Sequence, residues 1–242
     1  MKAIKTVDLT KEYKDTVAVD KFNIEIEEGE LFSLLGVNGA GKTTVIKMLS
    51  CLIKPTKGKA FIKEYSILED ENEVKKIIGV SPQETAVAPN LSVKENLELI
   101  CGISGFSREK SGEKIKELTK QLGLDEVIGK KAGKLSGGWQ RRLSIAMALI
   151  SEPSVLFLDE PTLGLDVIAR SELWETVRSL KGKVTIVLTT HYMEEAEALS
   201  DRVGIMKNGK LLALGTPEEL IEKTSSAKFE DAFIKIIKEE EK

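Results

Sequence analysis

One eight-residue motif constrains this chain more than any other feature of its sequence. Residues 36–43 read Gly-Val-Asn-Gly-Ala-Gly-Lys-Thr and match the pattern G-x-x-x-x-G-K-[ST]. The apolar run Leu31–Leu35 precedes the motif as an expected strand, and a pattern of helical period follows it over Thr43–Ile53. A glycine-rich turn that opens a helix presents backbone N–H groups and a positive helix end to a phosphate. The sequence therefore predicts a phosphate-binding loop.

The residues of this loop have separate expected roles. We expect Lys42 to reach the β- and γ-phosphates, Thr43 to hold Mg²⁺ and Thr44 to contact the α-phosphate. The glycine spacing differs from the G-x-G-x-x-G of dinucleotide-binding proteins, which disfavours that class. A GTPase or a small kinase would share the loop, although the guanine-reading pattern N-K-x-D does not occur in the sequence. The loop residues predicted to bind nucleotide are Gly36, Asn38, Gly39, Ala40, Gly41, Lys42, Thr43 and Thr44.

Polar side chains follow two further apolar runs, Val155–Leu158 and Val184–Thr190. The carboxyl ends of parallel strands meet at one edge of a sheet, so these side chains should lie beside the phosphate loop. Consecutive strand residues point to opposite faces, which assigns different roles to two adjacent acids. We expect Asp159 to join the Mg²⁺ shell, Glu160 to orient the attacking water, and His191 to contact the γ-phosphate and orient Glu160. The alternatives are an acidic turn and a structural histidine.

The order of apolar patterns predicts a mainly parallel α/β sheet, because short buried runs alternate with helical segments. The middle of the chain differs and carries helical patterns without a convincing strand. A stripe of Ile115, Leu118 and Leu122 illustrates it. We therefore expect a core formed by residues 1–84 and 151–222, with a helical subdomain inserted at about 85–150. An amphipathic helix within 223–242 would carry Phe229, Ala232, Phe233, Ile236 and Ile237, and we expect it to pack on its own domain.

The composition limits where in the cell the chain is expected to work and which partners it is expected to bind. The 242 residues contain no apolar run near the roughly 18 that a membrane helix needs. The first residues show no apolar signal core, so we expect a cytoplasmic chain. The net charge is −3 without a large basic block, which argues against nucleic acid as a partner. Cys51 and Cys101 have no pairing motif and are expected to be reduced thiols.

The segment Leu135–Gln140 reads Leu-Ser-Gly-Gly-Trp-Gln and resembles the signature of ABC proteins, ATP-binding proteins named for their cassette. It lies between the phosphate loop and the acid pair, as in that family. The remaining motifs agree in order and spacing over residues 13 to 191. Tyr13 resembles the adenine-stacking aromatic, Gln83 the Q-loop glutamine, Asp159-Glu160 the Walker B pair, Gly164-Leu165-Asp166 the D-loop, and His191 the switch histidine. The chain departs from the family pattern at Trp139, Leu163 and Val167.

The resemblance implies a fold and a set of site residues. The fold is a P-loop NTPase (RecA-like) core with a mainly parallel sheet, an antiparallel β subdomain and an inserted α-helical subdomain. The ligands are ATP and Mg²⁺. The implied catalytic residues are Glu160, His191, Gln83 and Lys42, and the implied metal ligands are Thr43, Gln83 and Asp159. The implied nucleotide-binding residues beyond the loop are Tyr13, Ser136, Gly137, Gly138 and Asp166.

Elementary chemistry also predicts an anion-binding function for the signature segment. Ser136 is a good helix N-cap, and a glycine-rich helix start is a second anion site. If the helical insert carries this site away from the phosphate loop, one chain cannot place both on one phosphate. The family's solution is a head-to-tail dimer in which Ser136 and Gly138 of one subunit close on the γ-phosphate held by the other. Without the resemblance, a capped helix after a flexible turn remains open as the interpretation.

The resemblance also implies partners for the chain. A second nucleotide-binding subunit, identical or different, would complete the dimer. Separate membrane permease subunits would dock in a groove near Gln83 on the cytoplasmic face of the cell membrane. Val87, Leu91 and Val93 either line this groove or belong to the core.

The end of the chain narrows the kind of ABC protein. Residues 215–220 and one further helix resemble the multidrug and antibiotic export group. We therefore expect an ATPase that powers export. The alternative is a non-transport ABC ATPase of DNA repair or translation. Such proteins keep every motif above but typically add coiled-coil insertions or a second cassette.

Overall fold

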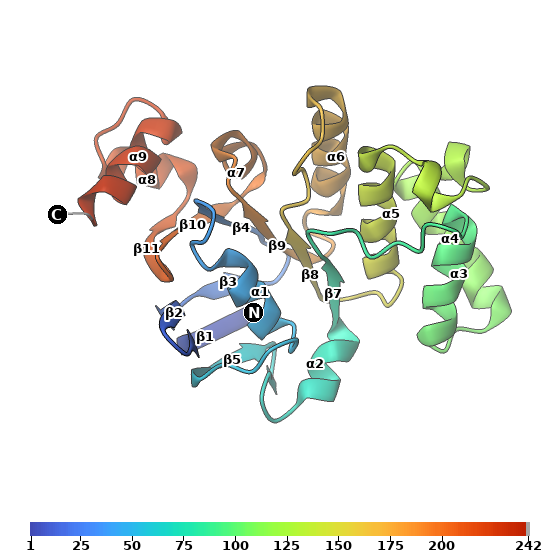
Figure 1. Cartoon of the computed structure of the whole chain (residues 1–242), viewed down its shortest axis with the longest axis horizontal. Helices are drawn as coiled ribbons and strands as arrows, with labels where there is room; N and C mark the ends of the chain where they lie inside the picture. Colours follow the sequence, from blue (N-terminus) through green and yellow to red (C-terminus); the bar gives the residue numbers. More distant parts are fainter. Residues whose placement is uncertain (241–242) are drawn as a thin grey trace.

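The computed structural model describes residues 1–240, and two β-sheets form its centre (Figure 1). Helices α3 to α5 lie at one end of the molecule, and α8 and α9 lie at the other. The strands are β1 Lys2–Tyr13, β2 Thr16–Phe22, β3 Glu25–Glu27, β4 Leu31–Gly36, β5 Lys57–Ile62, β6 Tyr65–Ser66, β7 Ile78–Ser81, β8 Val155–Asp159, β9 Thr185–Thr190, β10 Arg202–Lys207 and β11 Lys210–Gly215. The helices are α1 Lys42–Leu49, α2 Glu71–Ile77, α3 Val93–Ile103, α4 Arg108–Gln121, α5 Gly137–Leu149, α6 Val167–Leu180, α7 Met193–Leu199, α8 Pro217–Lys223 and α9 Phe229–Glu239.

The larger sheet confirms the predicted mainly parallel core. Its strand order within residues 1–240 is β11-β10-β4-β9-β8-β7, and every neighbouring pair from β10 to β7 is parallel. Only β11 runs antiparallel, as the second strand of a hairpin with β10. Because β4, β7, β8 and β9 point the same way, their carboxyl ends and the loops that follow them meet at one edge.

The smaller sheet is antiparallel and forms the expected β subdomain. Strands β2, β1, β5 and β6 are neighbours in that order, and β3 pairs with the other end of β1. A tight hairpin joins β1 to β2, where Tyr13 pairs with Thr16. The far end of β2 therefore lies close to the phosphate loop, since Asp20 N–H donates to the carbonyl of Gly209 and Gly209 N–H donates to that of Ala40.

Alternation along β8 shows how the strand separates two cores. Val155 and Phe157 join the apolar cluster between the two sheets and α1, whereas Leu156 and Leu158 join the cluster shared with α3 to α6. All four side chains are fully buried, and each contributes about 1.5–3 kcal/mol of hydrophobic stabilisation. The period of two continues into Asp159, which is thereby directed to the α1 side.

The middle of the chain is helical, as its sequence pattern predicts. Within residues 85–150 the structure contains helices and a single isolated bridge, with no strand. The stripe of Ile115, Leu118 and Leu122 is buried, and Val93 is buried with Val87 packed against its cluster. Val93 is thus a core residue. The cut points at 84–85, 150–151 and 222–223 stay a prediction.

The first helix is shorter than its sequence pattern suggests. The prediction of a helix to Ile53 was wrong, because α1 ends at Leu49 and Cys51 has a left-handed backbone with φ of 58°. Its amide N–H bonds the carbonyl of Met48, so the chain turns away from the helix axis. Leu52 is consequently 65% exposed instead of packing on the sheet.

The last helix packs on its own domain, as expected. Phe229, Ala232, Phe233 and Ile236 of α9 are buried against α8, β10 and β11, and Ile237 is partly buried there. Figure 1 shows α9 lying across α8 beside β11. Residues 241–242 of the predicted segment lie outside the described residues. Among residues 1–240, none of the helices combines the length and the apolar character required to cross a bilayer.

Candidate functional site

The predicted phosphate loop connects β4 to α1 at the edge where parallel strands end. At two positions in this loop, neighbouring backbone atoms leave no room for any side chain, so only glycine fits. A Cβ at Gly36 would lie 2.3 Å from the carbonyl oxygen of Met206, and one at Gly41 would lie 2.4 Å from that of Ala18. Gly41 also has φ of 103°, which side chains of L residues rarely adopt. The loop therefore packs tightly between β10 and β2, and its shape depends on both glycines.

Asp159 is the last residue of β8, and hydrogen bonds connect its side chain to α1 and to β9. Its Oδ1 accepts hydrogen bonds from the hydroxyl of Thr43 on α1 at 3.0 Å and from that of Thr189 on β9 at 2.5 Å. Asp159 is buried, so these bonds hold a carboxylate that water does not fully solvate. Thr43 and Asp159, both predicted metal ligands, are thus brought together. Thr189 was not predicted.

Glu160 follows the end of β8 and lies between a lysine and the histidine. Its Oε1 is 3.3 Å from Lys42 Nζ, and its Oε2 is 2.5 Å from His191 Nδ1. Lys42 also donates to the carbonyls of Gly36 and Val37 at 2.7 and 3.2 Å. Glu160 has φ of 47°, a left-handed conformation that costs of the order of 1 kcal/mol for such a residue. That turn, with Glu160 N–H bonded to Thr189, directs the carboxylate into the site.

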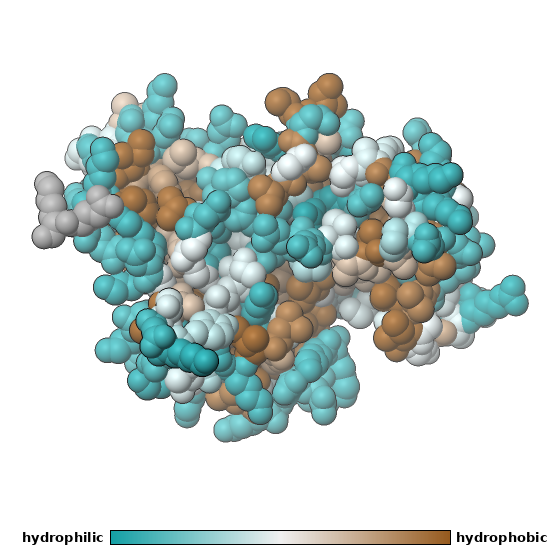
Figure 2. Space-filling view, viewed as in Figure 1, coloured by the Kyte–Doolittle hydropathy of each residue, from teal (hydrophilic) through white to brown (hydrophobic). Residues whose placement is uncertain are grey.

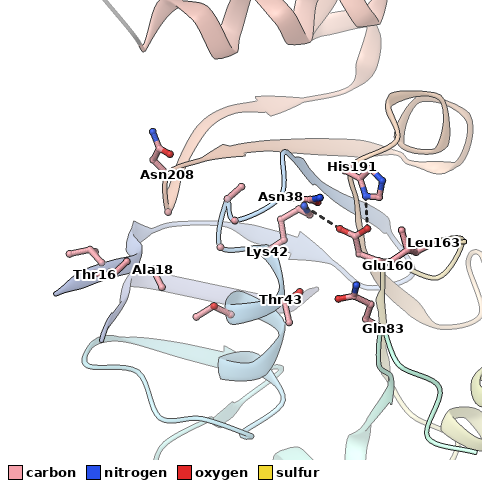
Figure 3. Close-up of a pocket in the computed structure, with 16 residues that line it drawn as sticks. Thr16, Ala18, Asn38, Lys42, Thr43, Gln83, Glu160, Leu163, His191 and Asn208 are labelled. Atoms are coloured by element: carbon pink, nitrogen blue, oxygen red, sulfur yellow. Dashed lines mark hydrogen bonds and ion pairs between the residues drawn. The ribbon is translucent and has the colours of Figure 1, made fainter. Parts of the chain in front are cut away.

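Lys42, Glu160 and His191 line one cavity of about 600 Å³, within the range of sites for small molecules and cofactors. Thr43 also lines it, whereas its partner Asp159 is not among the lining residues. Figure 3 shows Glu160 joined by dashed lines to Lys42 on one side and to His191 above, with the Gln83 side chain directed toward Glu160. Several lining residues were not predicted, and they come from the β1–β2 side, the D-loop segment and the β10–β11 turn. The residues around the cavity are Thr16, Val17, Ala18, Asn38, Gly39, Ala40, Gly41, Lys42, Thr43, Thr44, Gln83, Glu160, Leu163, His191, Asn208 and Gly209.

Some predicted site residues lie outside this cavity. Tyr13 is 46% exposed at the end of β1, where Lys11 Nζ lies 5.0 Å above its ring, and Thr16 to Ala18 line the cavity instead. Gly36 is the last residue of β4 and does not line the cavity, and its carbonyl accepts a hydrogen bond from Lys42 Nζ. Asp166 caps α6, with its Oδ1 accepting from the amides of Ile168 and Ala169 at 3.0 and 2.9 Å.

The segment Ser136–Gly138 also lies apart from the cavity. It opens α5 on the surface, next to Leu165 and Ala169, whose side chains would be 3.2 Å from a Cβ at Gly137 and Gly138 respectively. Ser136 occupies the predicted N-cap position, but its side chain makes no capping hydrogen bond, so that part of the prediction was wrong. The exposed Ser136 hydroxyl thus leaves the first amides of α5 without a side-chain cap.

Trp139 packs within the helical part of the molecule. It is partly buried against the apolar cluster of α3 to α6, and the Arg142 guanidinium lies 5.0 Å from its ring centre. Leu143, Ala146 and Leu149 of the same predicted face are buried. The unusual residue in the signature segment is therefore a packing residue of this chain.

Arg141 is a buried cation that sequence reasoning missed. Its Nη1 donates to the carbonyl of Pro82 at 2.6 Å and its Nη2 to that of Gln83 at 2.7 Å. Burial lowers the pKa of the Arg141 guanidinium, and the charges of Asp159 and Glu195 act in the opposite sense. The only available signal was its place one turn into the helix after the signature segment.

Glu195 is a second buried ionisable group beside the site. It lies on α7, four residues after His191, and its Oε1 accepts from the indole of Trp174 at 3.0 Å. Burial raises the pKa of the Glu195 carboxyl above its ordinary value of 4.5. The hydroxyls of Thr190 and Thr162, the indole and the charge of Arg170 act against that rise without cancelling it.

We expect Glu195→Gln to stabilise the chain increasingly as pH rises. Below pH 4.5 the carboxyl is protonated in both states, whereas above it the folded state keeps a proton that the unfolded chain loses. The free energy of unfolding therefore falls as pH rises toward the folded-state pKa, and glutamine removes that loss. The expected gain in Tm at pH 7–8 is about 2–4 °C per kcal/mol recovered. Thermal unfolding from pH 4 to 8 measures it, with Glu197→Gln on the exposed face of α7 as control. An equal effect at every pH would contradict the assignment.

The fold and the site together define a class of protein. A glycine-rich loop between a central parallel strand and a helix, with an acid pair and a histidine on adjacent strands, is the arrangement of P-loop nucleoside triphosphatases. A GTPase or a small kinase would share the phosphate loop, so the loop alone does not separate these classes.

Comparison with known proteins narrows the class. Residues 19–163 match the family described as ABC transporter. The chain is 43% identical over 203 residues to the human phospholipid-transporting ATPase ABCA3, covering 84% of this chain and 12% of that protein. It is 39% identical over 217 residues to the daunorubicin resistance ATP-binding protein DrrA3 of Streptomyces coeruleorubidus. That match covers 89% of this chain and 69% of DrrA3. The chain thus spans about an eighth of the human protein.

A solved structure agrees in fold. The dimeric post-hydrolysis state of the ATP-binding cassette MJ0796, bound to ADP and Pi, superposes with a TM-score of 0.79 at 30% identity, covering 88% of this chain and 98% of that one. The chain belongs to the ABC transporter family and is an ATP-binding cassette with the ATPase fold of that family.

Proposed function

We propose that this chain binds and hydrolyses Mg-ATP at a head-to-tail dimer interface and thereby powers export through separate membrane subunits. One observation carries the proposal. Glu160 lies between Lys42 and His191 in a cavity whose other wall is the phosphate loop, while the second anion-binding candidate, Ser136–Gly138, lies on a different surface. A second copy is the simplest source of the missing anion contacts.

The residues of the cavity have proposed roles in positioning and charge stabilisation. The loop amides and Lys42 would hold the phosphates, as the charge and the exposed helix start allow. Glu160 would orient the attacking water and accept its proton, and His191 would hold the Glu160 carboxylate and contact the γ-phosphate. Tyr13 and Asp166 lie outside the cavity, so we propose for them only contacts made when nucleotide and the second subunit are present.

The residues present fit Mg²⁺. Thr43 and Asp159 offer a hydroxyl and a carboxylate whose oxygens are 3.0 Å apart. Thr43 and Gln83 both line the cavity, and Asp159 lies behind Thr43. Mg²⁺ prefers such oxygen donors and takes few of them from protein when phosphates are present. Bound Mg²⁺ would neutralise charge on the β- and γ-phosphates.

A docking face for membrane subunits is supported by exposed apolar side chains. Leu99 and Ile103 on α3 are 47% and 75% exposed, and Leu52 follows α1 on the surface. Figure 2 shows apolar side chains at the surface over α3 and beside α1. Isolated exposed leucines are ordinary, but Leu99 and Ile103 are four positions apart on one face of α3, and neighbouring exposed apolar side chains are typical of a protein contact. We therefore propose that the chain works on the cytoplasmic face of a membrane.

The direction of transport rests on likeness alone. The similarity to a daunorubicin resistance protein supports export, and the similarity to a phospholipid-transporting ATPase supports an apolar or amphipathic cargo. The alternative, a non-transport ABC ATPase, would be favoured if nucleic acid stimulated hydrolysis. We expect no stimulation.

The dimer is tested by how activity depends on concentration. If hydrolysis needs two copies, ATP turnover per chain rises with protein concentration and levels off once the dimer dominates. Phosphate release is measured over a thousandfold range of protein concentration, with light scattering at the same concentrations to give the mass. A constant turnover per chain at concentrations where only monomer is present would sink the proposal.

A further inference from the structure

Arg141 makes two hydrogen bonds to consecutive backbone carbonyls on another element. The carbonyls belong to Pro82 and Gln83, at 2.6 and 2.7 Å, immediately after the end of β7. Arg141 is only 5% exposed, so its charged side chain is largely removed from water. A planar guanidinium can hold two acceptors at fixed geometry, which a lysine cannot. The segment that carries Gln83 is thus held in orientation as well as in distance.

Stability alone is a weak explanation for this arrangement. Removing a guanidinium from water is costly, and apolar residues of similar volume often replace buried cations without loss of stability. The hydrogen-bond partners of Arg141 are two neutral carbonyls. Burial lowers its pKa and the charges of Asp159 and Glu195 act to raise it, but neither carboxylate is paired with it. The position of Gln83 is what the two bonds determine.

Two further contacts attach the same helix to the same strand. Ser144 Oγ and Ser81 Oγ are 2.8 Å apart and buried. A Cβ at Gly79 would lie 2.3 Å from the carbonyl oxygen of Ala148, so strand and helix backbones are in close approach there. Positions 141, 144 and 148 share one face of α5. Helix α5 and β7 are therefore packed as one body from Gly79 to Gln83.

This body joins two parts of the proposed site. Its one end is Ser136–Gly138 at the start of α5, and its other end is Gln83, whose side chain is directed toward Glu160 in the cavity (Figure 3). We propose that Arg141 is a positioning residue that fixes Gln83 to the signature helix. This inference rests on the proposed function. A nucleotide that contacts Ser136 from a second subunit would thereby act on Gln83 in the first subunit's own cavity.

A double-mutant cycle in the full chain tests the proposal. Arg141→Gln, Gln83→Ala and the double variant are compared in kcat and in ATP Kd. We expect Arg141→Gln to lower kcat about 10- to 100-fold, the effect of a small misplacement of a site residue. The ATP Kd should change less than about threefold, because the phosphate loop is untouched. In the Gln83→Ala background, Arg141→Gln should have no further effect on kcat.

A second readout does not depend on hydrolysis. Without nucleotide, Arg141→Gln should speed amide hydrogen exchange at least tenfold in β7, which pairs with β8, and at Ala88, whose N–H donates to Asn96 Oδ1, while α6 and α7 keep their protection. Arg178→Gln is the matched control, since Arg178 also donates to a backbone carbonyl, that of Ala198, on the surface. It should change neither kcat nor exchange near Gln83. If Arg141→Gln does not fold, Arg141→Lys keeps the charge with a single donor group and enters the same cycle.

The outcomes separate two kinds of failure. Equal losses from Arg141→Gln with and without Gln83 would show that Arg141 acts on stability or elsewhere, and the inference would be lost. Unchanged exchange in β7 and at Ala88 would overturn it as well. If Gln83→Ala alone retained full turnover, the proposed role of Gln83 in the cavity would fail first, which is a failure of the proposed function.

Discussion

Glu160→Gln is expected to lower ATP turnover by about 10²–10⁴-fold, the range for loss of a positioned general base. The amide keeps the size of the carboxylate but can neither accept a proton nor pair with Lys42 and His191 as the carboxylate does at 3.3 and 2.5 Å. ATP binding should persist, because the phosphate loop is unaltered. An ATP-bound dimer should therefore accumulate.

Phosphate release at saturating ATP and equilibrium nucleotide binding measure these two effects. The matched control is Glu175→Gln, since Glu175 is exposed on α6 and pairs only with Arg178 among the ion pairs found in residues 1–240. It should leave both quantities unchanged. Near-normal phosphate release from Glu160→Gln would remove the glutamate from the proposed mechanism, whatever its position in the cavity.

Ser136→Arg is expected to abolish closure of the dimer while ATP binding stays intact. Ser136 is exposed and its side chain caps nothing, so the substitution should cost the folded chain little. In the proposed dimer, however, a long side chain would stand between the γ-phosphate and the first amides of α5. We expect the dimer to weaken by about 100-fold or more, as for loss of a central polar contact.

The substitution is best tested in the Glu160→Gln background, where the ATP-bound dimer accumulates. Size exclusion with light scattering should give a dimer for Glu160→Gln with ATP and a monomer for the double variant. Ser107→Arg provides the control, because Ser107 is also an exposed helix N-cap, whose hydroxyl accepts from Lys110 N–H at 3.2 Å. It should remain dimeric in the same background. A dimer of unchanged affinity carrying Ser136→Arg would refute the interface.

Much of the site could be predicted because its parts are short and ordered along the chain. The phosphate loop and the acids after an apolar strand are local patterns, and the rule that parallel strands end at one edge brings them together. The different roles expected for Asp159 and Glu160 agree with their different partners, since Asp159 bonds Thr43 and Glu160 contacts Lys42 and His191. The physical reason differs from the one expected, because Glu160 lies past the end of β8 with a left-handed backbone, where strand alternation no longer applies. The roles of these residues stay predictions.

Other expectations failed where local preference met tertiary contacts. The helical pattern after Thr43 ran past Leu49, but the backbone turns at Cys51 and exposes Leu52. Serine is favoured as a helix cap, yet the Ser136 side chain makes no capping bond. Periodicity reports which residues could continue a helix, whereas the neighbouring strands and loops decide where it stops.

By itself, the sequence determined the phosphate loop, the buried strands before it and before the acid pair and the histidine, and the helical middle of the chain, because these depend on neighbours within about ten positions. Only the tertiary structure decided that Arg141 holds the backbone at Pro82 and Gln83, that the β10–β11 turn at Asn208 closes the cavity, and that Ser136–Gly138 face away from it. Those contacts join segments about 60 to 170 residues apart, and no spacing along one chain specifies which distant surfaces will meet once the cores have packed.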